Sequence, residues 1–437
     1  MKKPLFLLLT CLLLMSCNSE KEKVCLLKGN VFDRESTALM MVKPRESGDD
    51  NNYIEIPIKE DGSFEYTLPV DYIDKYILVF KEDFESGRFP EPIVFLTDSE
   101  VIEFELYPNE NYEKNEIRGG EITELSNKYS DEKRKLFDVN FSPLNEKNIA
   151  LFEDNNYYSV AFQNYSSIKD TTKNDSIKYL MISKIDSLKE NGADLSEEAM
   201  VLKVKSDSLQ SMYNSWKQNY IINNPSLFAY SMFIQDIQLH YLNPNIEYAN
   251  KAYTILKEKF PNHPYTAIAD KSMFFINNLR VGGSIIDFTA PDANCEDVTL
   301  SKVIRKNKYT LVNLWAPWCS PCISKNRLIA PIYKQYRDKE FEVVSVIGET
   351  EDLESFEKAV KKESYPWENL REINSENQIW EKYNISGNGG IMYLVDSEGK
   401  ILISRPTPKE IEVFLKNKQL LFPSNLPEGE KLLEITL

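Results

Sequence analysis

Two cysteines three positions apart, Cys319 and Cys322, stand between a run of apolar residues and an amphipathic segment. The surrounding sequence is WAPWCSPC, residues 315–322. The apolar run at 309–314 has the length of a buried β-strand, and the spacing that follows predicts a helix. A cysteine at the start of a helix faces unpaired backbone N–H groups and the positive end of the helix dipole, which both stabilise a thiolate. This position therefore predicts a reactive Cys319.

Cys322 follows by nearly one helical turn, so its sulfur can reach Cys319 and resolve a mixed disulfide. We expect Cys319 to be the nucleophile and Cys322 the resolving thiol, with a redox-active disulfide between them. Pro321 suits the first turn of a helix, because its missing N–H has no carbonyl to bond there. Trp315 and Trp318 are expected to shield the pair from water.

The cysteine pair also allows two other interpretations, a structural zinc site and a peroxidatic cysteine. A structural zinc site needs two more ligands at suitable spacing. The remaining candidates are scattered along the chain: Cys25, His240, His263 and Cys295. No metal is expected, and Cys25 and Cys295 are interpreted as small buried residues. A peroxidatic cysteine would follow a Thr or Ser by three positions, whereas Ala316 occupies that place.

The first sixteen residues predict export from the cytoplasm. Lys2 and Lys3 precede an apolar run of eleven residues, 5–15, which is too short to span a bilayer and suits a secretory signal. The run ends in LMSC at residues 14–17, which resembles the bacterial lipobox although Met15 departs from it slightly. That resemblance implies acylation of Cys17 and a stable membrane anchor. The alternative is a plain secretory signal with a coincidental Cys17.

Length and charge exclude several classes of protein. A chain of 437 residues predicts two or three domains. Its 68 acidic and 52 basic side chains give a net charge of -16, which leaves no basic face for nucleic acid, so we expect protein partners. No second apolar stretch is long enough to cross a bilayer, and everything after Cys17 is expected to lie outside the cytoplasm.

The pattern of apolar residues changes twice along the chain. Residues 24–119 alternate with period two, as at 54–58 and 64–68 on either side of Asp61-Gly62, which predicts a β-hairpin in a small β-sandwich. Further strands are expected at 76–80, 93–96 and 101–107. Residues 120–281 have helical spacing, with Asp175 as an N-cap and Gly192 as a stop. Pro225 and residues 260–264 divide this region into several helices, whose aromatic stripes are interpreted as helix-to-helix core.

The last segment alternates strands and helices, which suits a mixed sheet with helices on both faces. Strands are expected at 309–314, 341–347, 391–395 and 400–404, and helices after Cys322, at 353–362 and at 408–418.

Residues 284–418 resemble the TlpA-like, membrane-anchored branch of the thioredoxin superfamily. The matching elements are Asp287-Phe288-Thr289, Val298-Thr299-Leu300-Ser301, the strand to Trp315, the cysteine pair, Phe341-Glu342-Val343-Val344, and Val395-Asp396 with Gly399-Lys400. The preceding regions look like the N-terminal region of many such lipoproteins of the Bacteroidota. The expected organisation is a signal peptide at 1–16, a tether at 17–23, a β-sandwich at 24–119, a helical region at 120–281 and a thioredoxin-like domain at 282–437.

The resemblance implies disulfide exchange with exported client proteins, without a cofactor. The protein would act as a reductant, supplied by a membrane electron donor that the sequence does not identify. It would work in the cell envelope, anchored on the periplasmic side or on the outer membrane. The rival interpretation is a binding or scaffold lipoprotein whose thioredoxin domain has little redox activity.

Four positions depart from the family pattern. The family has a cis-proline facing the cysteines, where this chain has Gly389 or Gly390, so the loop is expected to be trans or mobile and client docking to differ. Lys325 replaces a Glu near the second cysteine and would favour the thiolate, unless it is merely a solvated residue. Asn313 replaces a buried acid, and a water would have to serve as proton acceptor. Arg327 stands where a helix-kinking proline is usual.

Overall fold

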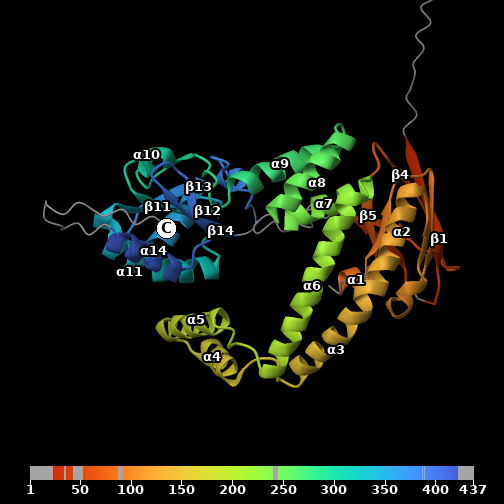
Figure 1. The fold of residues 1–437 in the computed structure, drawn as a ribbon, viewed down its shortest axis with the longest axis horizontal. Helices are drawn as coiled ribbons and strands as arrows, with labels where there is room; N and C mark the ends of the chain where they lie inside the picture. Colours follow the sequence, from red (N-terminus) through yellow and green to blue (C-terminus); the bar gives the residue numbers. More distant parts are fainter. Residues whose placement is uncertain are drawn as a thin grey trace, which may run out of the picture. The chain divides into compact units, whose positions relative to one another are not determined.

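The structure is a computed structural model that describes residues 23–33, 36–42, 53–86, 92–239, 245–385, 387 and 389–421 (Figure 1). The expected signal peptide and lipidation at Cys17 lie outside the described residues, as does His240. The described chain forms two compact units, one drawn from 1–143 and 209–232 and the other from 144–208 and 233–437. Among the residues described, no helix is both long and apolar enough to cross a membrane.

A β-sandwich of two four-stranded sheets forms the N-terminal part, as predicted. The strand orders are β4-β1-β7-β8 and β3-β2-β5-β6. Their bounds are β1 Val24–Val31, β2 Ala38–Val42, β3 Tyr53–Pro57, β4 Ser63–Pro69, β5 Lys75–Phe80, β6 Ile93–Leu96, β7 Val101–Leu106 and β8 Glu116–Arg118. Alternate residues of both sheets, such as Leu27, Leu39 and Phe104, fill one shared core. A short helix, α1 (Lys81–Glu85), follows β5.

The predicted β-hairpin across Asp61-Gly62 is wrong. The turn forms, with the Asp61 carboxylate accepting from the N–H of Ser63 at 3.0 Å. However, β3 pairs with β2, whereas β4 pairs with β1 in the other sheet. Ile56 of β3 and Phe64 of β4 meet in the sandwich core from opposite sheets. Alternation with period two is the same whether a turn joins strands within one sheet or across two, so the sequence pattern could not distinguish them.

Helices occupy most of the stretch from Glu121 to Asn278, as the spacing predicts. They are α2 Glu121–Lys133, α3 Val139–Glu153, α4 Val160–Thr171, α5 Asp175–Glu190, α6 Glu197–Asn223, α7 Leu227–Leu239, α8 Ile246–Lys259 and α9 Pro264–Asn278, with a π-helical segment at Arg134–Asp138. Trp216 stacks on Tyr129, with ring centroids 4.8 Å apart, and also contacts Phe137 in a tilted arrangement, so this aromatic stripe is helix-to-helix core. The helical residues are shared between the two compact units.

The N-cap of α5 is Asn174 and not Asp175, which is a correction. The Asn174 side chain accepts from the N–H of Ile177 at 3.2 Å, and Asp175 is the first residue inside the helix. Both residue types cap well, so the sequence alone left the register uncertain by one position. The predicted stop holds, since α5 ends at Glu190 and Gly192 adopts a φ of 66°.

A five-stranded mixed sheet of order β13-β12-β11-β14-β15 forms the C-terminal domain. Its strands are β11 Tyr309–Trp315, β12 Phe341–Thr350, β13 Asn369–Ile373, β14 Gly390–Asp396 and β15 Ile401–Ser404. The central strand β11 runs parallel to β12 and antiparallel to β14. The helices are α10 Leu300–Ile304, α11 Ser320–Tyr336, α12 Leu353–Glu363, α13 Ile379–Lys382 and α14 Pro408–Leu421.

Alternate residues of β11 face opposite sides of this sheet. Leu311 packs with residues of α11 and α14 on one face, and Val312 packs with residues of α10 and α13 on the other. The predicted mixed sheet with helices on both faces is confirmed.

The sequence pattern missed β13 and the short antiparallel pair of β9 (Thr289–Pro291) and β10 (Asp297–Thr299). In β13 the sequence NLREI suggests an exposed segment. The Glu372 carboxylate is nevertheless buried, because it accepts from the backbone N–H groups of Asn377 and Ile379.

The capping assignment predicts a difference between two neighbouring variants. Asn174→Ala removes the cap, so we expect helix α5 to lose about 1 kcal/mol of local stability. Ser176→Ala changes an exposed side chain in the first turn of α5 and leaves the cap in place, so we expect no loss there. Amide hydrogen exchange in α5 measures both. Equal exchange in the two variants would contradict the assignment of the cap to Asn174.

Candidate functional site

Cys319 and Cys322 lie where the central strand β11 passes into helix α11. They form a disulfide, with their Cα atoms 5.3 Å apart. Cys319 is the N-cap of α11, and its sulfur accepts from the N–H of Cys322 at 3.3 Å. The Cys319 N–H donates to the carbonyl of Ala316 at 3.0 Å, which closes the turn before the helix. The first cysteine therefore faces the N-terminal end of a seventeen-residue helix.

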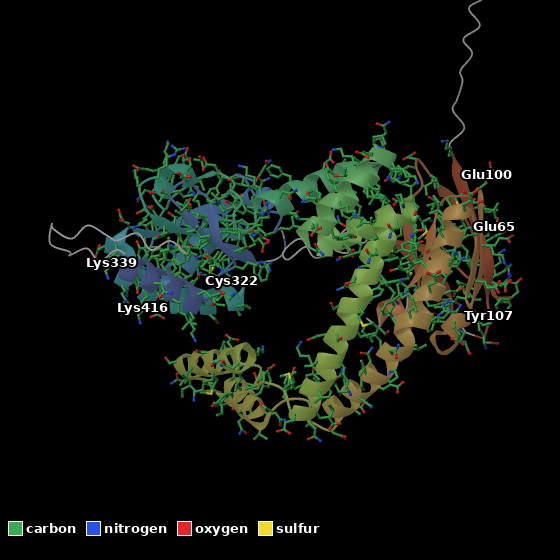
Figure 2. All side chains as sticks on the ribbon, in the orientation of Figure 1. Glu65, Glu100, Tyr107, Cys322, Lys339 and Lys416 are labelled. Carbon is green, nitrogen blue, oxygen red and sulfur yellow. A yellow bond between two sulfur atoms is a disulfide. The ribbon has the colours of Figure 1, made fainter. Side chains whose placement is uncertain are left out.

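The two tryptophans beside the pair have different environments. Trp315 is buried, and its indole N–H donates to the Ser345 hydroxyl at 3.0 Å. It packs in an apolar cluster against which Cys322 also lies. Trp318, expected to shield the pair, exposes 57% of its own surface, whereas Cys319 exposes 8%. Cys319 is therefore covered although Trp318 itself keeps more than half of its surface exposed. Figure 2 labels Cys322 in its place within that domain.

One part of that cover is Gly389. A Cβ atom added to Gly389 would lie 2.9 Å from the Cβ and 3.0 Å from the sulfur of Cys319. Gly389 also has a φ of 73°, which disfavours a side chain on its own account. Of the two glycines considered for the cis-proline position, Gly389 is thus the one that faces the disulfide. The described residues contain no cis peptide bond, so Gly389 and Gly390 are joined in trans.

Gly390 has a different role, at the start of β14. It stands opposite Trp315 in the antiparallel register with β11. A Cβ on Gly390 would overlap the carbonyl oxygen of Leu314. Because Gly390 has no side chain, its backbone can lie against the end of β11, beside Cys319.

The remaining sequence candidates lie on or under α11. Pro321 is exposed in its first turn, and Lys325 is exposed one turn after Cys322. Asn313 is buried in β11, where its amide donates to the side-chain oxygen of Asn326 at 3.0 Å. The position of the family's buried acid is therefore occupied by a neutral pair of amides.

Several residues near the site were missed by sequence reasoning. Asn326 follows Cys322 by four positions and so lies on the buried face of α11, which is the one signal that could have found it. Ser345, Glu363 and Tyr365 come from β12, the end of α12 and the segment after it, and no local pattern marks them.

The two isolated cysteines differ, and the expectation that both are buried is wrong for Cys295. Cys25 is buried in β1, but Cys295 is exposed with a φ of 66° in the turn between β9 and β10. The Asp292 carboxylate builds this turn by accepting from the N–H groups of Asn294 and Glu296, each at 2.8 Å. The turn places Cys295 on the surface regardless of its apolar character.

The strand–cysteine pair–helix unit on a five-stranded mixed sheet defines a thioredoxin-like domain. Residues 281–404 match the family model described as the AhpC/TSA family. Thiol-disulfide oxidoreductase ResA of Bacillus thuringiensis (strain Al Hakam) is 24% identical over 143 residues, which cover 32% of this chain and 78% of the relative. ResA of Bacillus anthracis matches with the same values. These matches confirm the predicted thioredoxin-like domain and its resemblance to thiol-disulfide oxidoreductases.

Solved structures with similarity to this chain include two from Bacteroides. The thioredoxin domain of a thiol-disulfide oxidoreductase from Bacteroides vulgatus is 25% identical, covering 32% of this chain and 99% of that chain, with a TM-score of 0.29. A thiol:disulfide interchange protein from Bacteroides sp. is 25% identical, covering 35% of this chain and 95% of that chain, with a TM-score of 0.28.

The contact between Gly389 and Cys319 predicts a position-specific effect of alanine. Gly387→Ala and Gly389→Ala both place a side chain at a φ of 73°, but only Gly389 has neighbouring atoms within 4 Å. We expect each to lose about 1 kcal/mol through its backbone conformation, and Gly389→Ala to lose about 1–3 kcal/mol more by overpacking. Denaturant unfolding of the oxidised proteins measures this. Equal losses would show that Gly389 does not press on Cys319.

The environments of Cys25 and Cys295 predict selective alkylation. Burial, and then the charge of Asp98, raise the pKa of the Cys25 thiol to about 11. At pH 8, iodoacetamide should therefore modify Cys295 and leave Cys25 intact, because the thiolate is the reactive form. Peptide mass spectrometry of native and denatured protein measures the difference. Labelling of Cys25 in the native protein would contradict its buried position.

Proposed function

We propose that this protein is a thiol-disulfide oxidoreductase that exchanges disulfides with exported proteins through Cys319 and Cys322. The observation that carries the proposal is a disulfide whose first cysteine caps helix α11. The resemblance to curated thiol-disulfide oxidoreductases supports the same chemistry.

In the reduced protein, Cys319 would react as the thiolate. The N–H of Cys322 already points at the Cys319 sulfur at 3.3 Å in the disulfide form, and the dipole of α11 adds to this stabilisation. The thiolate attacks one sulfur of the client disulfide, so a mixed disulfide forms and the other client sulfur leaves as a thiolate. Cys322, once deprotonated, then attacks the Cys319 sulfur. The second client sulfur leaves, and two electrons have passed to the client.

Client docking in this proposal uses the surface around Trp318 and Gly389. A Cβ on Gly389 would lie 3.1 Å from the outer edge of the Trp318 ring, so the two residues are neighbours beside Cys319. Trp318 offers an exposed apolar surface, and Gly389 leaves room for a polypeptide backbone to approach. We infer that an extended segment of the client lies across these two residues.

The proposal places the protein in the cell envelope as a lipoprotein. Support comes from the charged start, the apolar run and the LMSC segment that ends at Cys17. It also assigns the protein the role of reductant, which requires a membrane electron donor to return the Cys319–Cys322 disulfide to dithiol.

A binding or scaffold lipoprotein is the second candidate. Glycine in the cis-proline position favours it, and so do exposed apolar side chains on the long helices. Those side chains are Leu136, Val139, Ile149, Phe152, Val201, Val204 and Met212. A scaffold would need no reversible redox couple, which separates the two candidates experimentally.

The reduction potential of the protein without its expected signal peptide tests the proposal. Equilibration with glutathione buffers, followed by counting of alkylated thiols, should give one two-electron transition at Cys319 and Cys322. A potential near about -270 mV would agree with a reductant, and one near about -120 mV with an oxidant. Absence of a reversible couple would favour the scaffold.

Serine variants test the roles of the two sulfurs. Cys319→Ser should abolish disulfide exchange, because no nucleophile remains. Cys322→Ser should accumulate mixed disulfides with clients, because the resolving step is lost. Cys295→Ser is the matched control and should retain wild-type exchange. Gel mobility under non-reducing conditions and thiol counting measure all three, and unchanged exchange by Cys319→Ser would refute the assigned roles.

A further inference from the structure

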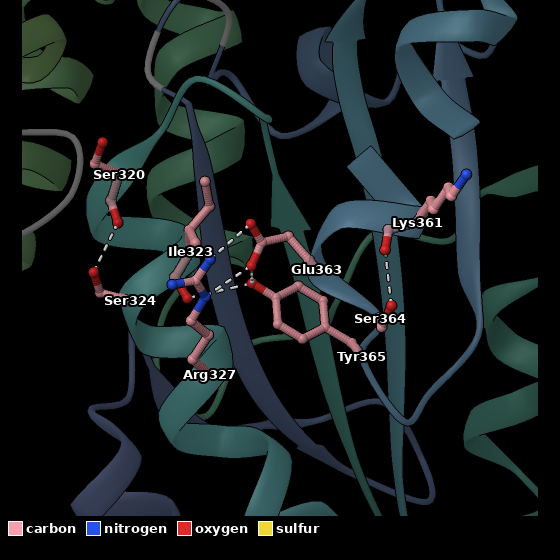
Figure 3. Close-up of polar contacts among 8 residues, drawn as sticks. All are labelled: Ser320, Ile323, Ser324, Arg327, Lys361, Glu363, Ser364 and Tyr365. Atoms are coloured by element: carbon pink, nitrogen blue, oxygen red, sulfur yellow. Dashed lines mark hydrogen bonds and ion pairs between the residues drawn. The ribbon is translucent and has the colours of Figure 1, made fainter. Parts of the chain in front are cut away.

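An ion pair whose carboxylate is buried lies between helices α11 and α12. The Glu363 side chain, at the last residue of α12, is 2% exposed. Arg327 of α11 binds it through two atoms, with Nε 2.8 Å from Oε2 and Nη2 3.0 Å from Oε1 (Figure 3). The Tyr365 hydroxyl lies 3.2 Å from the same Oε2. The three side chains therefore form one hydrogen-bonded cluster, which we name the 327–363–365 cluster.

This cluster reaches the first turn of α11. The Tyr365 hydroxyl also lies 3.3 Å from the carbonyl oxygen of Ile323, the residue directly after Cys322 (Figure 3). The Tyr365 ring meets the buried Trp315 ring edge to face, with centroids 5.6 Å apart. Cys322 and Tyr365 both pack against the apolar cluster that contains Trp315. The Tyr365 hydroxyl, whose single proton is shared between these two acceptors, thus links the Glu363 carboxylate to the helical turn that carries Cys322.

The charges of the cluster balance one another. A carboxylate this deeply buried needs a partner, and the two-point contact with Arg327 supplies it. Burial, followed by the Glu363 charge, holds the pKa of Tyr365 well above its usual range, so the phenol stays protonated and serves as a donor. The thiols therefore sit beside a pair with no net charge. Because the Glu363 side chain is buried and 32% of the Arg327 side chain is exposed, a charge left without its partner would act on the thiolate with less screening than on the open surface, and with the least screening at Glu363.

We propose that Glu363, Arg327 and Tyr365 are positioning residues that set the reduction potential of the Cys319–Cys322 couple. The inference rests on the proposed oxidoreductase function and deepens it. The Tyr365 hydroxyl links the first turn of α11 to the end of α12. Because the charges of the ion pair balance, the N-terminus of α11 remains the main stabiliser of the thiolate. Neither Glu363 nor Tyr365 is marked by the sequence around the cysteines.

Charge variants test the electrostatic part, because they predict opposite signs. Glu363→Gln leaves the guanidinium without its carboxylate, which stabilises the thiolate and the reduced form and so raises the potential. Arg327→Gln leaves the carboxylate and lowers it. We expect at least a threefold change in the equilibrium constant with glutathione in each direction, or about 14 mV. Alkylation rate against pH should show the thiol pKa falling in Glu363→Gln and rising in Arg327→Gln.

Three further variants complete the test. Arg327→Lys keeps the charge, so its equilibrium constant with glutathione should stay within twofold of the wild-type value. The same is expected of Lys361→Gln, which removes an exposed charge from the last turn of α12. Tyr365→Phe keeps the ion pair but removes the hydroxyl that donates to Ile323 and Glu363. Because the carboxylate then loses one donor, its negative charge opposes the thiolate more strongly, and the reduction potential should fall. These variants leave Glu363 paired, and they carry the test if Glu363→Gln does not fold.

The possible outcomes separate this inference from the proposed function. A wild-type protein without a reversible couple would overturn the proposed function. A reversible wild-type couple, with the glutathione equilibrium constants of all variants within twofold of the wild-type value, would overturn only the tuning role of the cluster. Shifts of the same sign in Glu363→Gln and Arg327→Gln would also overturn it, because loosened packing and not charge would then be the cause.

Discussion

The placement of the α11 N-terminus at the end of strand β11 is the constraint on which the rest of the site depends. Strand β11 is central in its sheet, with β12 and β14 on either side, so its last residue is fixed from both edges. Cys319 then caps the helix that leaves the strand. The register that pairs Trp315 with Gly390 brings the following loop, including Gly389, onto the Cys319 sulfur.

Several buried polar side chains around the disulfide form hydrogen bonds with one another across elements. Asn313 bonds Asn326, Trp315 bonds Ser345, and Glu363 bonds both Arg327 and Tyr365. Burying such groups costs free energy unless each finds a partner. The bonds of Asn326 and Arg327 join α11 to β11 and to α12, so they help to orient this helix, although the Asn313 Oδ1 and the Asn326 Nδ2 have no partner among the described residues. The thiols consequently lie in largely apolar surroundings that contain little uncompensated charge.

Sequence patterns predicted the positions of strands and helices well, but they predicted the pairing of the strands less well. The strands and helices predicted for the C-terminal domain agree to within a few residues with β11, β12, β14, β15, α11, α12 and α14, because apolar periodicity records which face of each element is buried. The same periodicity misassigned the turn at Asp61-Gly62, since alternation does not say which sheet a strand joins. Strand β13 escaped detection because its buried Glu372 is satisfied by backbone N–H groups that lie further along the chain.

What the sequence by itself determined is the local unit of strand, cysteine pair and helix. Its parts lie within a few residues of each other, and local hydrogen bonds and helix geometry dictate how Cys319 and Cys322 meet. The tertiary structure decided the cover over Cys319 by Gly389 and the contact between Arg327 and Glu363, which are 36 positions apart. Contacts of that range follow from strand register and from the packing of helices on the sheet, and no short stretch of sequence contains either.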